Sequence, residues 1–465
     1  MDYCMKKTIS FSILFLALFG QINAQEIKDN KSEKKLYPAL LGGLFSNTIF
    51  HLTGRLFGAD FSQTSLESFK TNLTSAWVWD NDTFLLNHPG HPYQGGLYHA
   101  AARSNGFNFY ESIFFDMTGS ITWELFGETD IPSLNDLVVT SFGGAAFGEM
   151  LHLLYLEIES PWAAALVSPM DALDNVIFKK KPPKTHNLNY FSVMTASGHI
   201  QSIKEDRQIF EQLRSNNNYP APLKTFTANI GGEIIYGDPF IQNSKKPYSQ
   251  FEIKLQLGGS FTFPWFDWTI LSDGYLISFN PIHSEKNILS TGLSMHYDLI
   301  VGNYTNFASN ALDWSIKWMH IFKNTEFALK THAGLTFLGS SEYYPFAELS
   351  GMHLETYETD NDYGIGGNIK SFFTLQNSKY GKLTLGVCSY LLYIIPWNKP
   401  ESQGIEFLNL SFFDYTIPLT KKFSIFVNNS LYLKTGTSHR KTNVISIADR
   451  ILLGVQWVFL DRKSI

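Results

Sequence analysis

The sequence predicts an α+β fold in two parts, an N-terminal helical domain over residues 37–184 and an antiparallel transmembrane β-barrel of about twelve strands over 185–465. Three observations predict this fold. Apolar residues recur with a period of about four before residue 184 and with a period of two after it. A basic, proline-containing segment, 179–184, separates the two patterns, and a helix cannot continue through it. The chain also opens with a segment typical of secreted proteins.

That opening segment, residues 1–24, has the organisation of a secretory signal peptide. Two lysines precede an apolar run over 9–19, and Ala24 supplies the small residue before the cleavage site. The apolar run is too short to span a bilayer. We therefore expect the mature chain to begin at Gln25, with a mobile charged lead-in over 25–36.

The composition of the 465 residues points to a protein that meets lipid. Charged residues make up 17% and aromatic residues 15% of the chain, and so little charge is unusual for a soluble protein. The net charge of −6 excludes a strong electrostatic case for nucleic-acid binding. Cys388 is alone once Cys4 leaves with the signal peptide, which excludes an intrachain disulfide and a cysteine metal site.

Helices are expected over 37–58, 65–79 and about 107–127, and again from Ser160. The segment 107–127 has two stripes of residues at four-residue spacing. One stripe is apolar and the other is a line of hydrogen-bonding groups. The apolar stripe is Phe109, Ile113, Met117, Ile121 and Leu125, and the polar stripe is Ser112, Asp116, Ser120, Glu124 and Glu128.

A further helix is expected to begin at Ser133, which can cap it, with Asp136 in the position of a capping-box acid. About twenty mostly apolar residues follow, which is long enough to span a bilayer. Glu149 and His152 share one face of this helix and argue against contact with lipid. We therefore expect a helix buried by protein, whose glycines let neighbouring backbones come close.

After residue 184 the chain alternates apolar and polar residues, which predicts strands with one apolar and one polar face. In one segment, Phe251, Ile253 and Leu255 alternate with Glu252 and Lys254. The predicted strands are 188–198, 225–236, 250–263, 267–280, 289–302, 310–322, 325–338, 363–375, 382–395, 404–417, 421–433 and 445–459.

A β-sandwich would also alternate, but these strands are long, roughly ten to fifteen residues where globular strands average about five or six. A lipid bilayer explains the repeated apolar face better. We therefore predict an outer-membrane barrel with apolar residues outward and polar residues in the lumen. Such a barrel is expected to contact outer-membrane lipid. Phe459 is the last aromatic residue of the final strand, close to where barrel-assembly signals usually lie, so the barrel-assembly machinery is the second expected partner.

The connections between strands predict the orientation of the barrel. Those after odd-numbered strands include the long ones, 199–224 and 339–362, whereas those after even-numbered strands are mostly short. Short turns of such barrels face the periplasm and long loops face outside. We therefore expect the helical domain on the periplasmic side or folded into the lumen.

The polar residues between His88 and His152 form the candidate functional site. A proline-rich segment, in which His88 and His91 lie, is interpreted as a loop. Lumen-facing residues such as His296, Asp298, Lys330 and His332 are interpreted as ordinary polar lining. The candidate polar cluster consists of His88, His91, His99, Arg103, Glu124, Glu128, Asp136 and Glu149.

A set of short motifs in the same region carries a family resemblance. The motifs are His88-Pro89, Gly95-Gly96-Leu97-Tyr98-His99, Ala102-Arg103, Trp123-Glu124, Glu128, Pro132-Ser133, Asn135-Asp136 and Gly148-Glu149. Over about residues 80–180 the chain resembles an uncharacterised family of predicted outer-membrane proteins of Gram-negative bacteria, known mainly as a domain of unknown function. The resemblance implies a location and an architecture, and it implies no activity.

Three hypotheses remain open for the cluster. In the structural hypothesis, Arg103 pairs with Glu124, Glu128 or Glu149, because buried charges need partners. In the metal hypothesis, histidines 88, 91 and 99 bind a divalent ion together with Glu124 or Glu149, although the His-Glu-x-x-His motif is absent.

In the third hypothesis the cluster is a lipid hydrolase site, with Ser120 and a nearby histidine as nucleophile and base. No Gly-x-Ser-x-Gly elbow supports it. We therefore expect an outer-membrane pore or envelope scaffold whose helical domain caps or plugs the lumen, without metal or cofactor. A hydrolase acting on envelope lipid is the alternative.

Overall fold

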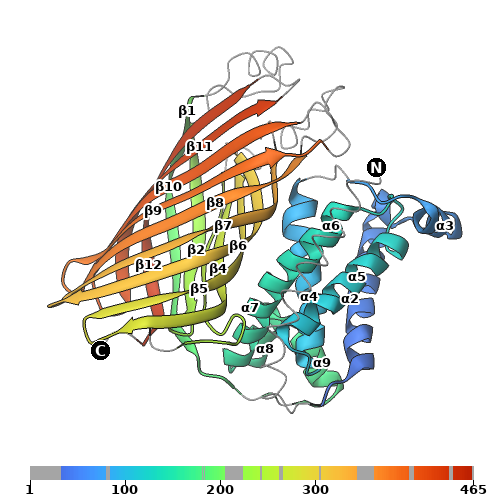
Figure 1. The fold of residues 1–465 in the computed structure, drawn as a ribbon, viewed down its shortest axis with the longest axis horizontal. Helices are drawn as coiled ribbons and strands as arrows, with labels where there is room; N and C mark the ends of the chain where they lie inside the picture. Colours follow the sequence, from blue (N-terminus) through green and yellow to red (C-terminus); the bar gives the residue numbers. More distant parts are fainter. Residues whose placement is uncertain are drawn as a thin grey trace.

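The computed structural model describes residues 33–79, 84–180, 182, 184–204, 224–240, 243–260, 265–302, 305–342, 361–396, 403–438 and 443–462. The predicted signal peptide lies outside the described residues, as does most of the predicted lead-in. The described chain forms a helical bundle followed by a closed barrel, and the two lie side by side (Figure 1).

The bundle contains four long helical segments that run along one another (Figure 1). They are α2 (Leu36–Phe57), η2 with α4 (Leu86–Gly90 and His91–Ser104), α5 (Phe109–Phe126), and the continuous α6, η3 and α7 (Leu134–Val138, Val139–Gly143 and Gly144–Glu157). Shorter helices are η1 (Asp60–Ser62), α3 (Leu66–Thr74), α8 (Pro161–Val167) and α9 (Pro169–Ile177).

Local capping explains where two of the long helices begin. Asn108 and Glu111 form a capping box at the start of α5, in which each side chain accepts from the other residue's backbone N–H. The predicted cap at Ser133 is confirmed, since its hydroxyl accepts from the backbone N–H of Asp136 at 3.3 Å.

The predicted loop around His88 and His91 is wrong, because the structure has a π-helical turn, η2, that leads directly into α4. Pro92 is the second residue of α4 and lies in its first turn, where proline is tolerated. Pro89 lies within the wider π turn.

The barrel confirms the predicted fold class: twelve strands close into one antiparallel sheet in which each strand pairs with its neighbours in sequence and β1 pairs with β12. Every predicted strand is present, and most of the observed ones are longer. The strands are β1 (Leu188–Lys204), β2 (Lys224–Tyr236), β3 (Phe251–Ser260), β4 (Trp265–His283), β5 (Asn287–Gly302), β6 (Thr305–Phe322), β7 (Thr325–Glu342), β8 (Asn361–Asn377), β9 (Gly381–Ile394), β10 (Gly404–Pro418), β11 (Phe423–Ser438) and β12 (Val444–Asp461).

The alternation along the strands sorts side chains between the two faces as predicted. On β6, Trp314 and Ile316 are 51% and 46% exposed on the outer face. Ser315 and Lys317, between and after them, are buried in the lumen. We call the end of the barrel where β1 begins and β12 ends the terminal end, and the opposite end the loop end.

The bundle packs against the outer wall of the barrel, on the outward side of strands β2 to β8. One hydrophobic cluster joins the two parts. It contains Phe84, Phe109, Tyr110, Ile113, Ala145, Ala146, Met150 and Leu154 from the bundle, and Tyr236, Tyr248, Phe251, Ile253, Leu276, Met295, Tyr297, Leu299, Val301 and Ala308 from the barrel. The described helices therefore lie beside the barrel, which differs from the expectation that they cap or plug the lumen. Outward residues of a barrel are apolar, so helices can bury them as well as lipid can.

The segment Leu134–Glu157 follows this wall from one end to the other. Val139 packs with Leu338, near the loop end of β7. Glu157, at the other end of the segment, accepts a hydrogen bond from the backbone N–H of Asn187 at 2.6 Å, just before β1 begins. The segment therefore spans the height of the barrel wall.

Polar contacts fix the bundle at the loop end. The hydroxyl of Tyr363, on the outer face of β8, accepts from the side-chain amides of Asn87 at 2.7 Å and Asn135 at 3.0 Å. The hydroxyl of Tyr297 on β5 donates to the backbone carbonyl of His88. Because these bonds are buried between bundle and barrel, they specify one docking position.

Candidate functional site

Four charged side chains, three of them buried, meet at the centre of the bundle, and we call them the His99 cluster: His99, Arg103, Asp116 and Glu149. The His99 ring contacts Asp116 Oδ2 through Nδ1 at 2.8 Å and Glu149 Oε2 through Nε2 at 3.0 Å. Arg103 contacts the same Glu149 carboxylate, with Nε 2.7 Å from Oε2 and a guanidinium nitrogen 3.0 Å from Oε1. Helices α4, α5 and α7 thus converge on one ionic network.

Glycines bring α4 and α7 close enough for these contacts. A methyl group on Gly95 would lie 1.9 Å from the carbonyl oxygen of Thr140, and one on Gly144 would lie 2.6 Å from the Cα of Gly95. One turn further along α7, a methyl group on Gly148 would lie 2.7 Å from the Cβ of His99. The predicted close approach of backbones is therefore confirmed, and it places His99 against Glu149.

The cluster balances two cationic side chains against two carboxylates, and only Arg103 among its four members is partly exposed. His99, Asp116 and Glu149 are at most 1% exposed. Only a protonated imidazole can donate from both ring nitrogens, so the two flanking carboxylates suit an imidazolium. Because each ring nitrogen of His99 already has a partner, this histidine has no free nitrogen to act as a general base.

A second histidine pair lies toward the terminal end. His152 Nδ1 is 2.8 Å from Asp171 Oδ1, and the Ser168 hydroxyl donates to the other oxygen of Asp171 at 2.6 Å. Both His152 and Asp171 line a cavity of about 450 Å³, whose wall also includes Arg103 and Lys180. Because Arg103 lines it, this cavity reaches the edge of the His99 cluster.

Burial at the terminal end shifts the pKa of two side chains that lie outside the long helices. Desolvation raises the pKa of the Asp174 carboxyl above its usual range, although hydrogen bonds from Ser104 and Asn105 act in the opposite direction. Desolvation likewise lowers the pKa of the Lys180 ammonium, against the attraction of Asp174, whose Oδ2 lies 3.7 Å away.

The remaining candidates lie at the loop end, away from His99. Glu124 accepts from the backbone N–H of Ser133 at 2.7 Å, and Glu128 accepts from the indole N–H of Trp123 at 3.0 Å. Glu124 thus links α5 to the start of α6, and Glu128 fixes the chain just after the end of α5.

The two histidines of the segment that was predicted as a loop also lie apart from the His99 cluster. His91 is 3.6 Å from Asp136 and shares a hydrogen bond with Thr140. The ring of His88 packs against that of Phe84 at a tilt, with ring centroids 4.4 Å apart. Among the described residues, no three His, Cys, Asp or Glu side chains are grouped as a metal ion would require. The structure therefore lends no support to the metal hypothesis.

Two carboxylates of these networks were not among the predicted site residues. Asp116 belongs to the polar stripe of 107–127, so its spacing from Glu124 was the signal that could have placed it in the site. Asp171 follows a Ser-Pro pair and gave no comparable signal. Three carboxylates were predicted as alternative partners of Arg103, and the structure pairs it with Glu149.

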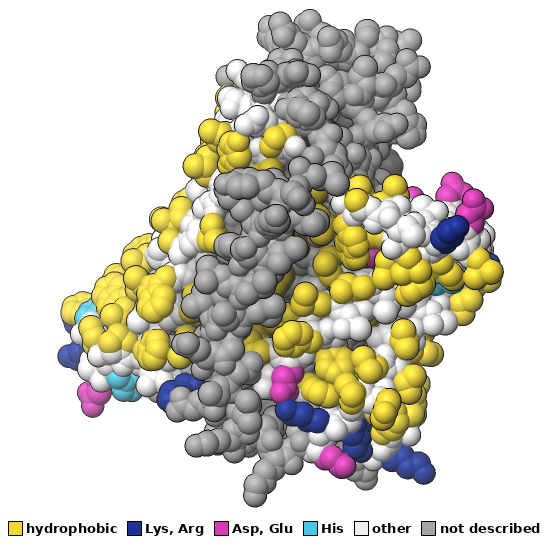
Figure 2. All heavy atoms as spheres, turned by 45° about the vertical axis from the view of Figure 1, so that its right-hand side comes forward, with side chains coloured by type: hydrophobic (Ala, Val, Ile, Leu, Met, Phe, Trp, Pro, Cys, Tyr) yellow, Lys and Arg dark blue, Asp and Glu magenta, His cyan; other side chains and the backbone are white. Residues whose placement is uncertain are grey.

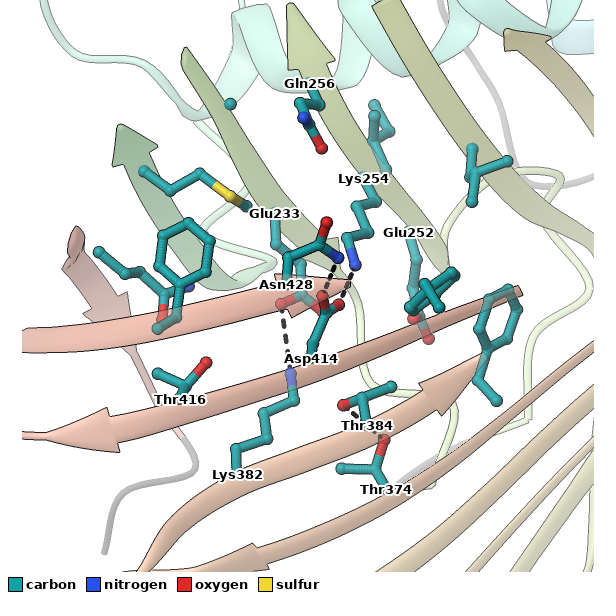
Figure 3. A pocket seen from close by; sticks show the side chains of 18 of the residues that line it. Glu233, Glu252, Lys254, Gln256, Thr374, Lys382, Thr384, Asp414, Thr416 and Asn428 are labelled. Atoms are coloured by element: carbon teal, nitrogen blue, oxygen red, sulfur yellow. Dashed lines mark hydrogen bonds and ion pairs between the residues drawn. The ribbon is translucent and has the colours of Figure 1, made fainter. Parts of the chain in front are cut away.

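A second polar cavity, of about 140 Å³, lies in the terminal half of the barrel lumen. Its charged side chains neutralise one another across the strands (Figure 3). Lys254 on β3 pairs with Asp414 on β10, and Lys382 on β9 lies 3.2 Å from Glu233 on β2. Asn428 adds a hydrogen bond to Asp414.

Comparison with known proteins agrees with the predicted resemblance. Residues 76–173 match the family model of a domain of unknown function (DUF3943). This confirms the resemblance to an uncharacterised family, and the match contains every member of the His99 cluster. No curated protein matches the chain significantly.

Solved structures similar to this chain include three barrels. The NanC porin is 10% identical with a TM-score of 0.26, over 58% of this chain and 98% of its own. OmpT of Vibrio cholerae is 6% identical with a TM-score of 0.23, over 60% and 100%. Outer membrane phospholipase A of Escherichia coli is 8% identical with a TM-score of 0.25, over 59% and 93%. At these identities the likeness concerns the fold alone.

Proposed function

We propose that this protein is a closed outer-membrane barrel that serves as a scaffold for the bundle on its outer wall, without an open pore. The observation that carries the proposal is the filling of the lumen. In the loop half, inward side chains from both sides of the barrel form one apolar cluster. Its members are Ile200, Leu271, Ile300, Phe307, Cys388, Tyr390, Leu392, Ile394, Leu408, Leu410, Phe412, Tyr432 and Ala448.

Ion pairs that cross the lumen reinforce this closure. Lys370 on β8 lies 3.0 Å from Asp298 on β5. Arg450 on β12 donates to both oxygens of Asp267 on β4, at 2.8 and 2.9 Å. Each pair joins strands that are not neighbours in the sheet. Such buried, hydrogen-bonded pairs tie opposite sides of the barrel together and occupy the lumen between them.

The strand connections support the orientation. The turns at the terminal end after β4, β6, β8 and β10 span only 284–286, 323–324, 378–380 and 419–422, whereas 205–223 and 343–360 connect strands at the loop end. Short turns face the periplasm in outer-membrane barrels. This pattern supports an orientation in which the terminal end, with the cavity beside His152, faces the periplasm.

A lipid-active hydrolase is the second candidate, and one observation keeps it open. The His152 and Asp171 pair lines a cavity, so His152 is better placed than His99 to act as a base. Ser120, the predicted nucleophile, is buried and has no hydrogen-bond partner among the described residues. It is therefore not positioned as an activated serine.

Conductance across a planar bilayer tests the proposal. We expect the purified protein to insert without a steady open-channel current, because the apolar cluster closes the lumen. A stable conductance like that of a porin would overturn the closed scaffold. Hydrolysis of phospholipid by the purified protein, lost in His152→Gln while the barrel stays folded, would replace it by the hydrolase.

A further inference from the structure

The wall that the bundle covers is the part of the barrel that would otherwise face lipid. Met295 and Leu299 occupy outward positions on β5, and each is at most 2% exposed beneath the helices. On the uncovered strand β9, the outward residues Leu391 and Tyr393 are 52% and 46% exposed. Anything that packs along the height of a membrane-spanning wall must itself lie within the membrane.

We infer that the bundle is embedded in the bilayer beside the barrel and that acyl chains cover its outer face. This inference rests on the outer-membrane placement of the barrel in the proposed function, and it does not depend on the closure of the lumen. It assigns a lipid-facing surface to the helices of the family-matched region and to α2, which precedes it.

The polarity of the bundle is inverted relative to a water-soluble protein. On α2, Leu41, Phe45 and Ile49 are 61%, 44% and 46% exposed, whereas Ser46 and Asn47 are buried. The side-chain amide of Asn47 donates to the Gly119 carbonyl inside the bundle at 3.0 Å. Polar residues that face the interior of a bundle, with an apolar exterior, are typical of helices in lipid.

Among the described residues of the bundle, charged side chains are exposed only at its two ends. Between Leu36 and Gly54 of α2, and throughout α4, α5 and the segment Leu134–Glu157, no described charged residue is exposed. The space-filling view shows a hydrophobic field over the bundle with charges at its upper and lower margins (Figure 2). Exposed charges at the loop end are Arg55, Asp60, Glu67, Lys70 and Asp130, and those at the terminal end are Glu33, Lys34, Lys35, Glu159, Lys179 and Lys184.

The distance between these charged ends fits a bilayer. The 22 residues of α2 span about 33 Å at ~1.5 Å per residue, close to the ~30 Å hydrocarbon core. The 24-residue segment Leu134–Glu157 is also long and apolar enough to cross a membrane.

The helix contacts also have the form found in membranes. Gly144 and Gly148, four residues apart on α7, form the close crossing with Gly95 and Gly96 of α4. Small residues at this spacing let helices pack in lipid, where apolar side chains gain nothing by leaving the solvent. Lipid is therefore the occupant that the outer face fits, because the charge-free surface continues the apolar exterior of the barrel between charged margins.

Collision measurements on spin labels test the inference on the full chain in lipid vesicles. Leu41→Cys, Phe45→Cys and Ile49→Cys carry the label on the proposed lipid face, in a Cys4→Ser background. Glu33→Cys and Gln63→Cys carry it at the two exposed ends. Cys388 is buried in the lumen and stays unlabelled. All five changes replace side chains on the surface, and circular dichroism together with heat-modifiable migration verifies the fold.

We expect labels on the lipid face to collide with dissolved oxygen, which concentrates in hydrocarbon, and to lose collisions with a water-soluble nickel chelate. The loss relative to Glu33→Cys and Gln63→Cys should be at least about tenfold. Frequent nickel collisions at all three positions would place the bundle in water and overturn the inference. Few collisions with either reagent would show a protein cover, which also overturns it. Conductance of the same samples reports separately on the closed barrel.

Discussion

The covered and open walls of the barrel are built from the same pattern but meet different surroundings. Met295 on the covered wall is 2% exposed and Leu453 on the open wall is 64% exposed, yet each is an apolar residue in the outward register of a long strand. The bundle replaces lipid on the covered wall. Alternation in a sequence therefore states which face of a strand is apolar, but not what that face touches.

The two walls also differ in how specifically they are held. Lipid makes no fixed hydrogen bond with the open wall, whereas the covered wall presents Tyr363 and Tyr297 to donors and acceptors of the bundle. The bundle in turn is held together by the His99 cluster and by the glycine crossing of α4 with α7. Changes in these features should therefore affect the covered wall and leave the barrel folded.

The largest effect is expected from Glu149→Gln, which leaves the buried charge of His99 and the largely buried charge of Arg103 without their shared carboxylate. Breaking a buried ion pair in this way costs about 3–5 kcal/mol. The helical signal in circular dichroism should melt at a lower temperature, while heat-modifiable migration of the barrel is unchanged.

A double variant is the control for this prediction. Arg103→Met together with Glu149→Gln removes the unpaired guanidinium and should recover part of the loss. Equal melting of Glu149→Gln and the native protein would show that the cluster does not hold the bundle together.

The next effect in size is expected from Gly95→Ala, because the new methyl group would lie 1.9 Å from the Thr140 carbonyl oxygen. Overpacking of this kind costs about 1–3 kcal/mol. Limited proteolysis should cut the bundle faster. In Gly43→Ala the added methyl group would have Tyr98 as its nearest neighbour at 3.8 Å, so this variant should be as resistant as the native protein. Equal resistance of both variants would contradict the described crossing.

Much of this fold could be predicted because the strand signal is local. A period of two sustained over many residues identifies each strand without knowledge of its neighbours, and all twelve were found. The helix α4 was missed because Pro89 and Pro92 are usual signs of a loop, and a sequence does not show that one lies in a π turn and the other in a first turn. The docking wall was missed because the outward residues of β5 look like those of β9.

The candidate site was predictable only as a set of residue types. His99, Arg103 and Glu149 come together as charged residues in apolar surroundings must, but Asp116 completes the cluster only because α5 packs against α4 at that height. Which carboxylate meets which cation depends on where helices cross. That crossing is set by Gly95 and Gly144 across fifty residues of chain.

A smaller effect is expected at the docking contact itself. Tyr363→Phe removes the hydroxyl that accepts from Asn87 and Asn135, and losing these bonds costs about 1–2 kcal/mol. Hydrogen exchange of backbone amides in η2 and α6 should accelerate. Tyr393→Phe is the matched control on the open wall, where the hydroxyl accepts from Gln403 near the loop end, and it should leave those amides unchanged. Equal exchange in the two variants would mean that the hydroxyl of Tyr363 does not fix the bundle.

The smallest effect is expected from Asp174→Asn, at the terminal end of the bundle. Burial raises the pKa of Asp174 in the folded protein, so the folded state binds this proton more tightly than the unfolded state. The stability contributed by this group is therefore present at acid pH and falls as the pH rises through the ordinary aspartate range to the raised value. Asparagine cannot ionise, so melting of the bundle should depend less on pH in this variant.

Glu67→Gln, an exposed change at the loop end, should keep the native dependence. An unchanged pH profile in Asp174→Asn would mean that Asp174 reaches solvent in the folded protein and does not hold its proton more tightly there.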